Sequence, residues 1–136
     1  MKKNSKLICL ILGFVLLLIA SCTKDDTNSN TDPRDQFVGS WTHVEKSQSF
    51  GTTTYSISIS KANDNTNVIV KNFYQLGSGT NSIVEVSDNN LIIGQQVVSG
   101  QNIHGGGTFS SNKINWTYYT DDGVQKDTCT AVSTKQ

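Results

Sequence analysis

The hydrophobic pattern of this chain changes from one continuous apolar run to a series of alternating segments. Residues 7–20 are apolar throughout, and no comparable run follows them. In 52–61, by contrast, Tyr55, Ile57 and Ile59 alternate with polar residues. A period of two places the apolar side chains on one face of a β-strand and the hydroxyl groups on the other. The part of the chain after the apolar run is therefore predicted to fold as β-sheet.

The same alternation predicts further strands, separated by turns rich in Asn, Asp and Gly. Trp41 and His43 share one face of their segment, and Ile114, Trp116 and Tyr118 share one face of theirs. The predicted strands are 40–46, 52–61, 68–73, 82–87, 90–93, a less regular 95–109, 113–120 and 127–134, with a bend or bulge at the three glycines 105–107. These make about eight strands with no helix after residue 22, and their short connections imply sequential antiparallel pairing.

A meander of this kind leaves two exposed sheet edges unless the sheet closes on itself. Closure into an up-and-down barrel removes both edges, and an eight-stranded barrel either fills its own interior or holds one small ligand. We therefore predict an all-β fold with an up-and-down antiparallel β-barrel, and the alternative is a two-sheet β-sandwich. The composition agrees, because the chain after residue 22 is rich in Ser, Thr, Asn, Val and Ile and poor in Leu, Ala and Glu.

The N-terminal segment 1–21 has the organisation of a secretory signal peptide. Lys2, Lys3 and Lys6 form a positive region ahead of the apolar run. As a helix, that run would span about 21 Å, which is less than the roughly 30 Å of a bilayer's hydrocarbon core. We therefore expect the segment to be cleaved rather than to remain as a transmembrane anchor.

The residues Ile19-Ala20-Ser21-Cys22 resemble a lipobox, the processing site of bacterial lipoproteins. The resemblance implies cleavage between Ser21 and Cys22 and a diacylglycerol group on the sulfur of Cys22. Small residues before the cysteine let a protease approach the bond. Because each buried CH₂ contributes about 0.8 kcal/mol, two or more acyl chains suffice for stable anchoring. The predicted partner of this end of the chain is therefore a membrane.

Lys24-Asp25-Asp26 follows Cys22 and resembles the lipoprotein export signal of Bacteroides-type bacteria. The resemblance implies a lipid-anchored protein of the outer membrane that faces the cell exterior. Residues 27–32 contain no apolar residue and are predicted to be a flexible spacer. The expected organisation is a signal peptide over 1–21, a lipidated N-terminus and tether over 22–35, and a folded domain over 36–136.

The folded domain opens with DPRDQFVGSW at 32–41, which resembles the start of small lipocalin-like β-barrel lipoproteins from the same bacteria. The pair Gly39 and Trp41 is also similar to the G-x-W of the first lipocalin strand. The likeness continues loosely through 71–73 and 129–131, and so it covers most of 32–136. It implies a lipocalin-like barrel, and it suggests a fold rather than a specific function.

Charge and motifs then exclude several classes of function. Without Lys2, Lys3 and Lys6, eight basic residues face 11 acidic ones and the net charge is −3, which disfavours a nucleic-acid partner. No catalytic or phosphate-binding signature is present. We therefore predict no catalytic residue, no metal ligand and no cofactor. Cys129, the one cysteine left after Cys22 is lipidated, is expected to be a small buried side chain.

His43 and Glu45 lie two residues apart on one strand face. Together with His104 they would form a sparse acid–base or metal site if all three converged. The simpler interpretation is that they are ordinary polar residues near a barrel rim. A small hydrolase or a metal-binding protein is therefore the least favoured function.

The aromatic residues Trp41, Tyr55, Trp116 and Tyr118 either fill the barrel or line a ligand cavity, and core is the preferred interpretation. Tyr119 falls on the opposite face from its neighbour and is a candidate for a partner-binding surface. The predicted function is a non-catalytic binding module for a small apolar ligand or a glycan. The alternative is a structural or adhesion module that binds a protein through its outer surface.

Overall fold

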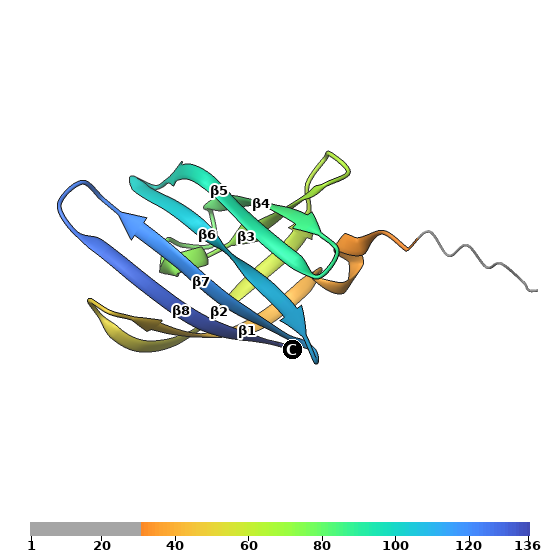
Figure 1. The fold of residues 1–136 in the computed structure, drawn as a ribbon, viewed down its shortest axis with the longest axis horizontal. Coiled ribbons are helices and arrows are strands. Elements are labelled where there is room, and N and C mark those ends of the chain that lie inside the picture. Colours follow the sequence, from red (N-terminus) through yellow and green to blue (C-terminus); the bar gives the residue numbers. More distant parts are fainter. Residues whose placement is uncertain (1–30) are drawn as a thin grey trace, which may run out of the picture. The chain divides into compact units, whose positions relative to one another are not determined.

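Eight antiparallel strands form a closed barrel in the computed structural model, which describes residues 31–136 (Figure 1). They are β1 (Gly39–Ser47), β2 (Gly51–Lys61), β3 (Asn67–Lys71), β4 (Asn81–Ser87), β5 (Asn90–Val98), β6 (Gln101–Ser110), β7 (Lys113–Asp121) and β8 (Lys126–Lys135). Each strand pairs with the next, and β8 pairs with β1. The predicted up-and-down barrel is thereby confirmed over the alternative β-sandwich.

The predictions for the N-terminal segment fall outside the described residues. They concern the signal peptide 1–21, the lipidation site Cys22 and the export signal Lys24 to Asp26. The folded unit begins at Thr31, so residues 32–35, which the sequence assigned to the tether, belong to it.

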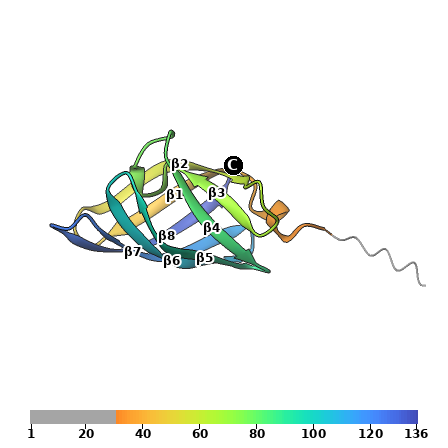
Figure 2. The ribbon, with the colours of Figure 1, turned by 90° about the horizontal axis from the view of Figure 1, so that it is seen from above.

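The strands run between two ends, which we call the closed end and the mouth. The closed end carries the turns 62–66, 88–89 and 111–112 and the 3₁₀ helix η1 (Pro33–Gln36). The mouth carries the turns 48–50, 99–100 and 122–125 and the segment 72–80, which contains a second 3₁₀ helix, η2 (Phe73–Gln75). Figures 1 and 2 show the described chain entering beside the closed end and the β7–β8 turn at the mouth.

Arg34 of η1 binds the chain to the closed end. Its Nη1 donates hydrogen bonds to the backbone carbonyls of Asp64 and Asn67 in and after the β2–β3 turn, while its Nη2 pairs with Asp32 at 2.7 Å. Hydrogen bonds from Arg34 and Lys61 hold the pKa of Asp32 well below its usual range. Because the guanidinium satisfies several carbonyls at once, η1 is fixed across the barrel end.

Aromatic side chains fill the space behind η1. Phe37 and Trp41 are fully buried, and the Trp41 indole N–H donates to the Phe37 carbonyl at 2.8 Å. The Phe109 ring packs edge-on against both, with centroids 5.5 Å from Phe37 and 6.3 Å from Trp41. At this end of the barrel, packed aromatic rings of the described residues therefore fill the interior.

Three details of the predicted elements are wrong. The strands predicted over 90–93 and 95–109 are instead β5 and β6, which are separated by the turn at 99–100. The strand predicted over 68–73 ends at Lys71, because Asn72 adopts a left-handed conformation with φ 59° and the chain turns into η2. The prediction of no helix after residue 22 missed η1 and η2, although both are single short turns. Within residues 31–136, no helix is both long and apolar enough to span a bilayer.

The bend or bulge predicted at the three glycines is also misplaced. Gly105 to Gly107 lie in the continuous ladder of β6, and the register shift lies in β5 between Ile93 and Gln96. The glycines instead permit close approach to β7. A Cβ on Gly105 would lie 2.4 Å from the backbone oxygen of Thr117, and one on Gly107 would lie 2.8 Å from the Trp116 ring. Glycine here makes room for the neighbouring strand and for an interior aromatic ring.

Replacing Gly105 by Ala tests this packing. The residue has φ +145° as well as the steric clash, so we expect Gly105→Ala to lower the free energy of unfolding by roughly 2–4 kcal/mol in urea titrations. Gly94→Ala is the matched control, since its added Cβ meets nothing within 4 Å and should change stability by less than about 1 kcal/mol. Equal stability of the two variants would contradict the packing argument.

Candidate functional site at the barrel mouth

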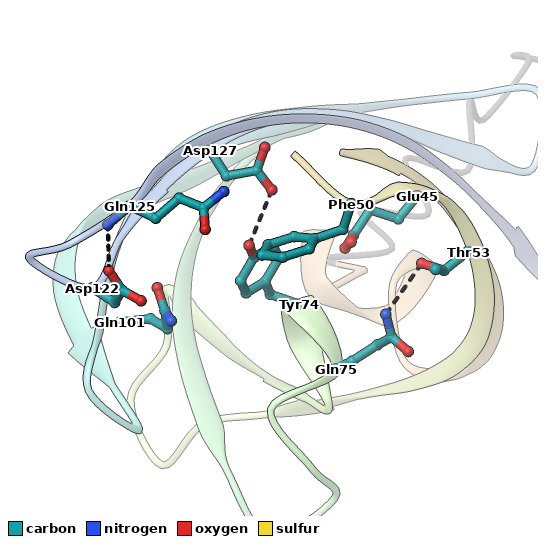
Figure 3. A pocket seen from close by; sticks show the side chains of 9 residues that line it. All are labelled: Glu45, Phe50, Thr53, Tyr74, Gln75, Gln101, Asp122, Gln125 and Asp127. Carbon is teal, nitrogen blue, oxygen red and sulfur yellow. Dashed lines mark hydrogen bonds between the residues drawn. The ribbon is translucent and has the colours of Figure 1, made fainter. Parts of the chain in front are cut away.

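A pocket of about 240 Å³ opens at the mouth (Figure 3). Seven of its nine lining residues are polar and two are aromatic, with three carboxylates, three amides and no basic side chain. The lining residues are Glu45, Phe50, Thr53, Tyr74, Gln75, Gln101, Asp122, Gln125 and Asp127. They come from both strands and turns, so the barrel wall and the mouth loops build the pocket together.

The aromatic candidates from the sequence lie beneath this pocket. Trp41, Trp116 and Tyr118 are buried in the core, and Tyr55 is partly buried against it. Phe73 of η2 joins them, with its ring centroid 4.5 Å from Tyr118 and 5.2 Å from Trp116. These rings fill the middle of the barrel, which leaves the mouth as the part of the interior where a ligand can bind.

Glu45 is the buried carboxylate at the floor of the pocket, with 2% of its surface exposed. Both Tyr55 and Tyr118 donate hydrogen bonds from their hydroxyl groups to its Oε2. Its Oε1 accepts no hydrogen bond from the described residues. Among these residues, the fully buried side-chain atoms without a partner are His43 Nε2 and Ser82 Oγ. Glu45 Oε1 has no hydrogen-bond partner either, but it is not one of these fully buried atoms, so it is accessible from the pocket that Glu45 lines.

His43 is a neutral, fully buried neighbour of Glu45. Its Nδ1 lies 2.7 Å from Ser133 Oγ, which also accepts the Trp116 indole N–H at 2.9 Å. Because that indole can only donate, the economical arrangement has Ser133 donating to Nδ1, which leaves the proton of His43 on Nε2. Nε2 lies 3.9 Å from Glu45 Oε2, too far for a hydrogen bond. Burial lowers the pKa of His43 to about 4.

Burial also keeps the two tyrosines protonated. It raises the pKa of both Tyr55 and Tyr118 well above the usual range, and the neighbouring Glu45 raises both further. The hydroxyl groups therefore remain donors at any ordinary pH, and they hold the Glu45 carboxylate in one orientation.

Asp127, the second buried carboxylate, has a different role. Its Oδ2 accepts from Ser47 Oγ at 2.6 Å, from the Tyr74 hydroxyl at 3.0 Å and from Cys129 Sγ at 3.4 Å, and its Oδ1 accepts from the Ser49 backbone N–H at 3.1 Å. Burial alone would raise the pKa of Asp127, but these hydrogen bonds outweigh it and lower that pKa. Asp127 thus ties the β1–β2 turn and η2 to β8.

Cys129 is buried, as the sequence predicts. Burial raises the pKa of its thiol above the usual range, and the carboxylates of Glu45 and Asp127 add to the effect. Because the thiolate is the reactive form, this side chain is inert packing.

His104 does not join His43 and Glu45. Along β6 the side chain of Ile103 points inward and that of His104 points outward, where its ring stacks on Tyr119 at 5.1 Å. This pair borders a hollow of about 360 Å³ on the outer wall. Within residues 31–136, no group of three His, Cys, Asp or Glu side chains is placed to hold a metal ion.

Three members of the interior network, Asp127, Tyr74 and Ser133, were not predicted from the sequence. A signal existed for two of them, because Asp127 and Ser133 share the inward parity of Cys129 and Ala131 along β8. None existed for Tyr74, whose position depends on the left-handed residues of η2.

Comparison with known proteins relates this chain to others by fold. No family model matches the chain, and no curated protein matches it. A solved structure of a redesigned β-barrel, b11L5F_LGL, is similar with a TM-score of 0.59 at 13% identity, covering 77% of this chain and 96% of that one. The structure of EF1p2_mFAP2b bound to DFHBI has a TM-score of 0.54 at 12% identity, covering 77% of this chain and 98% of that one. At such identities the likeness concerns the barrel fold alone.

The buried imidazole of His43 predicts an acid-sensitive barrel. The pKa of His43 is about 4 in the folded state, against 6.5 for an ordinary histidine. Between these values the unfolded chain binds a proton that the native state excludes, so stability falls as the pH falls. We expect a loss of roughly 2–3 kcal/mol between pH 7 and pH 4, measured as the urea midpoint at each pH.

His43→Gln should flatten this pH dependence, whatever it does to absolute stability. His104→Gln, which removes the exposed histidine, is the control and should leave the slope unchanged. An unaltered slope in His43→Gln would show that another group carries the effect.

Proposed function

We propose that this protein is a surface lipoprotein, anchored in the outer membrane by acyl chains on Cys22, whose barrel binds a small polar ligand or a glycan at its mouth. The observation that carries the binding role is the mouth pocket with the open Oε1 of the buried Glu45 at its floor. The proposed lipid anchor and surface location are based on the lipobox-like residues 19–22 and the residues 24–26, which resemble an export signal.

A polar ligand fits this barrel better than an apolar one. A carrier of apolar molecules needs an open apolar interior, and here Trp41, Phe73 and Trp116 occupy that volume. The remaining pocket presents carboxylate, amide and hydroxyl groups. The exposed ring of Phe50 and the ring of Tyr74 add flat apolar surfaces of the kind that pack against a sugar or another ring.

Binding without catalysis is the simplest role for these groups. The imidazole of His43 is neutral and enclosed, and the thiol of Cys129 is protonated. Neither His43 nor Cys129 therefore gives Glu45 an activated nucleophile or a proton-transfer partner in the pocket.

The position of the mouth, at the end of the barrel opposite the point where the described chain enters, suits a binding site displayed at the cell surface. The described chain enters beside the closed end, where Asp32 and Arg34 are fixed, and the mouth lies at the other end. A molecule arriving from outside the cell would reach the mouth without passing the point where the proposed tether joins the barrel.

The alternative role, adhesion through the outer wall, has one observation in its favour. His104 and Tyr119 form an exposed stacked pair beside the outer hollow. Such a pair offers a rigid aromatic surface to a protein or a glycan.

The proposed anchor is tested with two variants in the native host. Cys22→Ala should abolish labelling by a radioactive fatty acid and release the protein from membranes, because the sulfur of Cys22 is the acyl acceptor. Replacing Lys24, Asp25 and Asp26 together by Ala should leave the label but reduce cleavage by external protease in intact cells.

Cys129→Ala is the matched control for the first variant and should keep the label, since Cys129 is buried. Retained labelling of Cys22→Ala would overturn the lipoprotein proposal. Unchanged protease cleavage of the triple variant would overturn the export signal.

The proposed mouth site is tested by placing the same bulky residue on either side of the barrel wall. Gln101 lines the mouth pocket and the adjacent Asn102 lines the outer hollow. In saturation-transfer NMR with a panel of monosaccharides, disaccharides and small polar metabolites, we expect bound compounds to be lost with Gln101→Trp and retained with Asn102→Trp. The reverse result would transfer the binding role to the outer wall.

A further inference from the structure

We infer that the mouth pocket selects ligands that carry a protonated amine, with the ammonium group bound to Oε1 of Glu45. This inference rests on the proposed binding function and specifies its ligand class. It depends on three features of the pocket: its uncompensated charge, the one open carboxylate oxygen, and the donors and acceptors around that oxygen.

The pocket has negative charge that no described neighbour neutralises. Glu45, Asp122 and Asp127 line it without any Lys or Arg. The nearest imidazole, that of His43, is neutral. Lys126 is exposed, and its Nζ lies 3.8 Å from Asp121, which is not a lining residue. A concave site of one sign raises the local concentration of the opposite charge.

The three carboxylates are not equivalent, and only Glu45 combines burial with an open oxygen. Both oxygens of Asp127 accept hydrogen bonds from the protein. Asp122 is exposed, and its Oδ1 accepts from the backbone N–H groups of Val124 and Gln125 in its own turn. The geometry therefore points to a single ionic contact at the floor of the pocket.

Glu45 lacks the cation that a buried carboxylate ordinarily has. Burial of a charge is unfavourable unless the charge is paired. In the described residues its contacts are the neutral hydroxyls of Tyr55 and Tyr118, both on Oε2, and the distant His43. An ammonium ion bound to Oε1 would supply the missing positive charge.

An ammonium ion also suits the rest of the lining. It has three donors and no acceptor, and Gln75 and Gln101, which also line the pocket, carry side-chain oxygens that are acceptors. The rings of Phe50 and Tyr74 offer faces for cation–π contact (Figure 3). A carboxylate ligand would meet like charge, and an alcohol would form a weaker hydrogen bond with Oε1.

Three probes of one shape and different charge test the inference. They are 2-phenylethylammonium, 2-phenylethanol and 3-phenylpropanoate, titrated into the purified, ¹⁵N-labelled full chain at pH 7. We expect the ammonium probe to shift the backbone amides of Glu45, Gln101 and Asp127. The affinity of the ammonium probe should exceed that of the alcohol by about tenfold or more and should fall with added salt. The anionic probe should shift none of these amides.

Glu45→Gln should reduce the affinity for the ammonium probe by about tenfold or more and bring it close to that of the alcohol. Glu85→Gln is the matched control, because it removes the same charge from an exposed position on β4 and should change affinity by less than about twofold. Should Glu45→Gln fail to fold, as judged by circular dichroism, the ranking of the three probes on the unmodified chain decides the question.

The failures of the two proposals are distinguishable. If the alcohol shifts the mouth amides with the same affinity as the ammonium probe, or if no probe shifts them, the charge selectivity is overturned. The mouth site itself is judged separately, by the comparison of Gln101→Trp with Asn102→Trp.

Discussion

The pairing of β1 with β8 is the constraint on which the rest of the structure depends. It runs from Trp41 to Ser47 on β1 and from Cys129 to Lys135 on β8, and it removes the two edges that a meander would expose. Closure also fixes the interior volume of the barrel. Every inward side chain must then share one narrow space, so a large ring on one strand requires a small residue on its neighbour. Gly107 beneath Trp116 is an example, and open space is left at the mouth.

Inside that fixed volume, the buried side chains differ in polarity between the closed end and the mouth. The closed end is aromatic, with Phe37, Trp41 and Phe109 in contact, whereas the mouth end contains Glu45 and Asp127. Buried polar groups must find partners, and here they find them across strands, from Tyr118 on β7 to Glu45 on β1 and from Ser47 on β1 to Asp127 on β8. The polar network therefore reinforces the closure of the barrel as it builds the floor of the pocket.

Alternation in the sequence was sufficient to predict the regular strands and their inward faces, because period two is a property of each strand alone. The barrel was predicted from the need to remove exposed sheet edges, with a β-sandwich as the alternative. Alternation placed Trp41, His43 and Glu45 together on one face, as the structure has them. It failed where the outcome depends on distant partners or on single backbone angles. Asn72 ends β3 through a left-handed φ, and the register shift of β5 lies opposite β6 rather than at its glycines. Lipidation of Cys22 and export to the cell surface stay predictions, since they concern residues outside 31–136.

The two buried carboxylates of the mouth show how environment rather than residue type separates structure from recognition. Asp127 has both oxygens engaged by the protein, so it fixes the β1–β2 turn and η2. Glu45 has one oxygen engaged by two tyrosines and the other open. A ligand would therefore meet loops already held in place and an acceptor already oriented. Binding to such a site orders few additional groups and loses little conformational entropy. This preorganisation is what makes a pocket of modest size a credible binding site in an otherwise filled barrel.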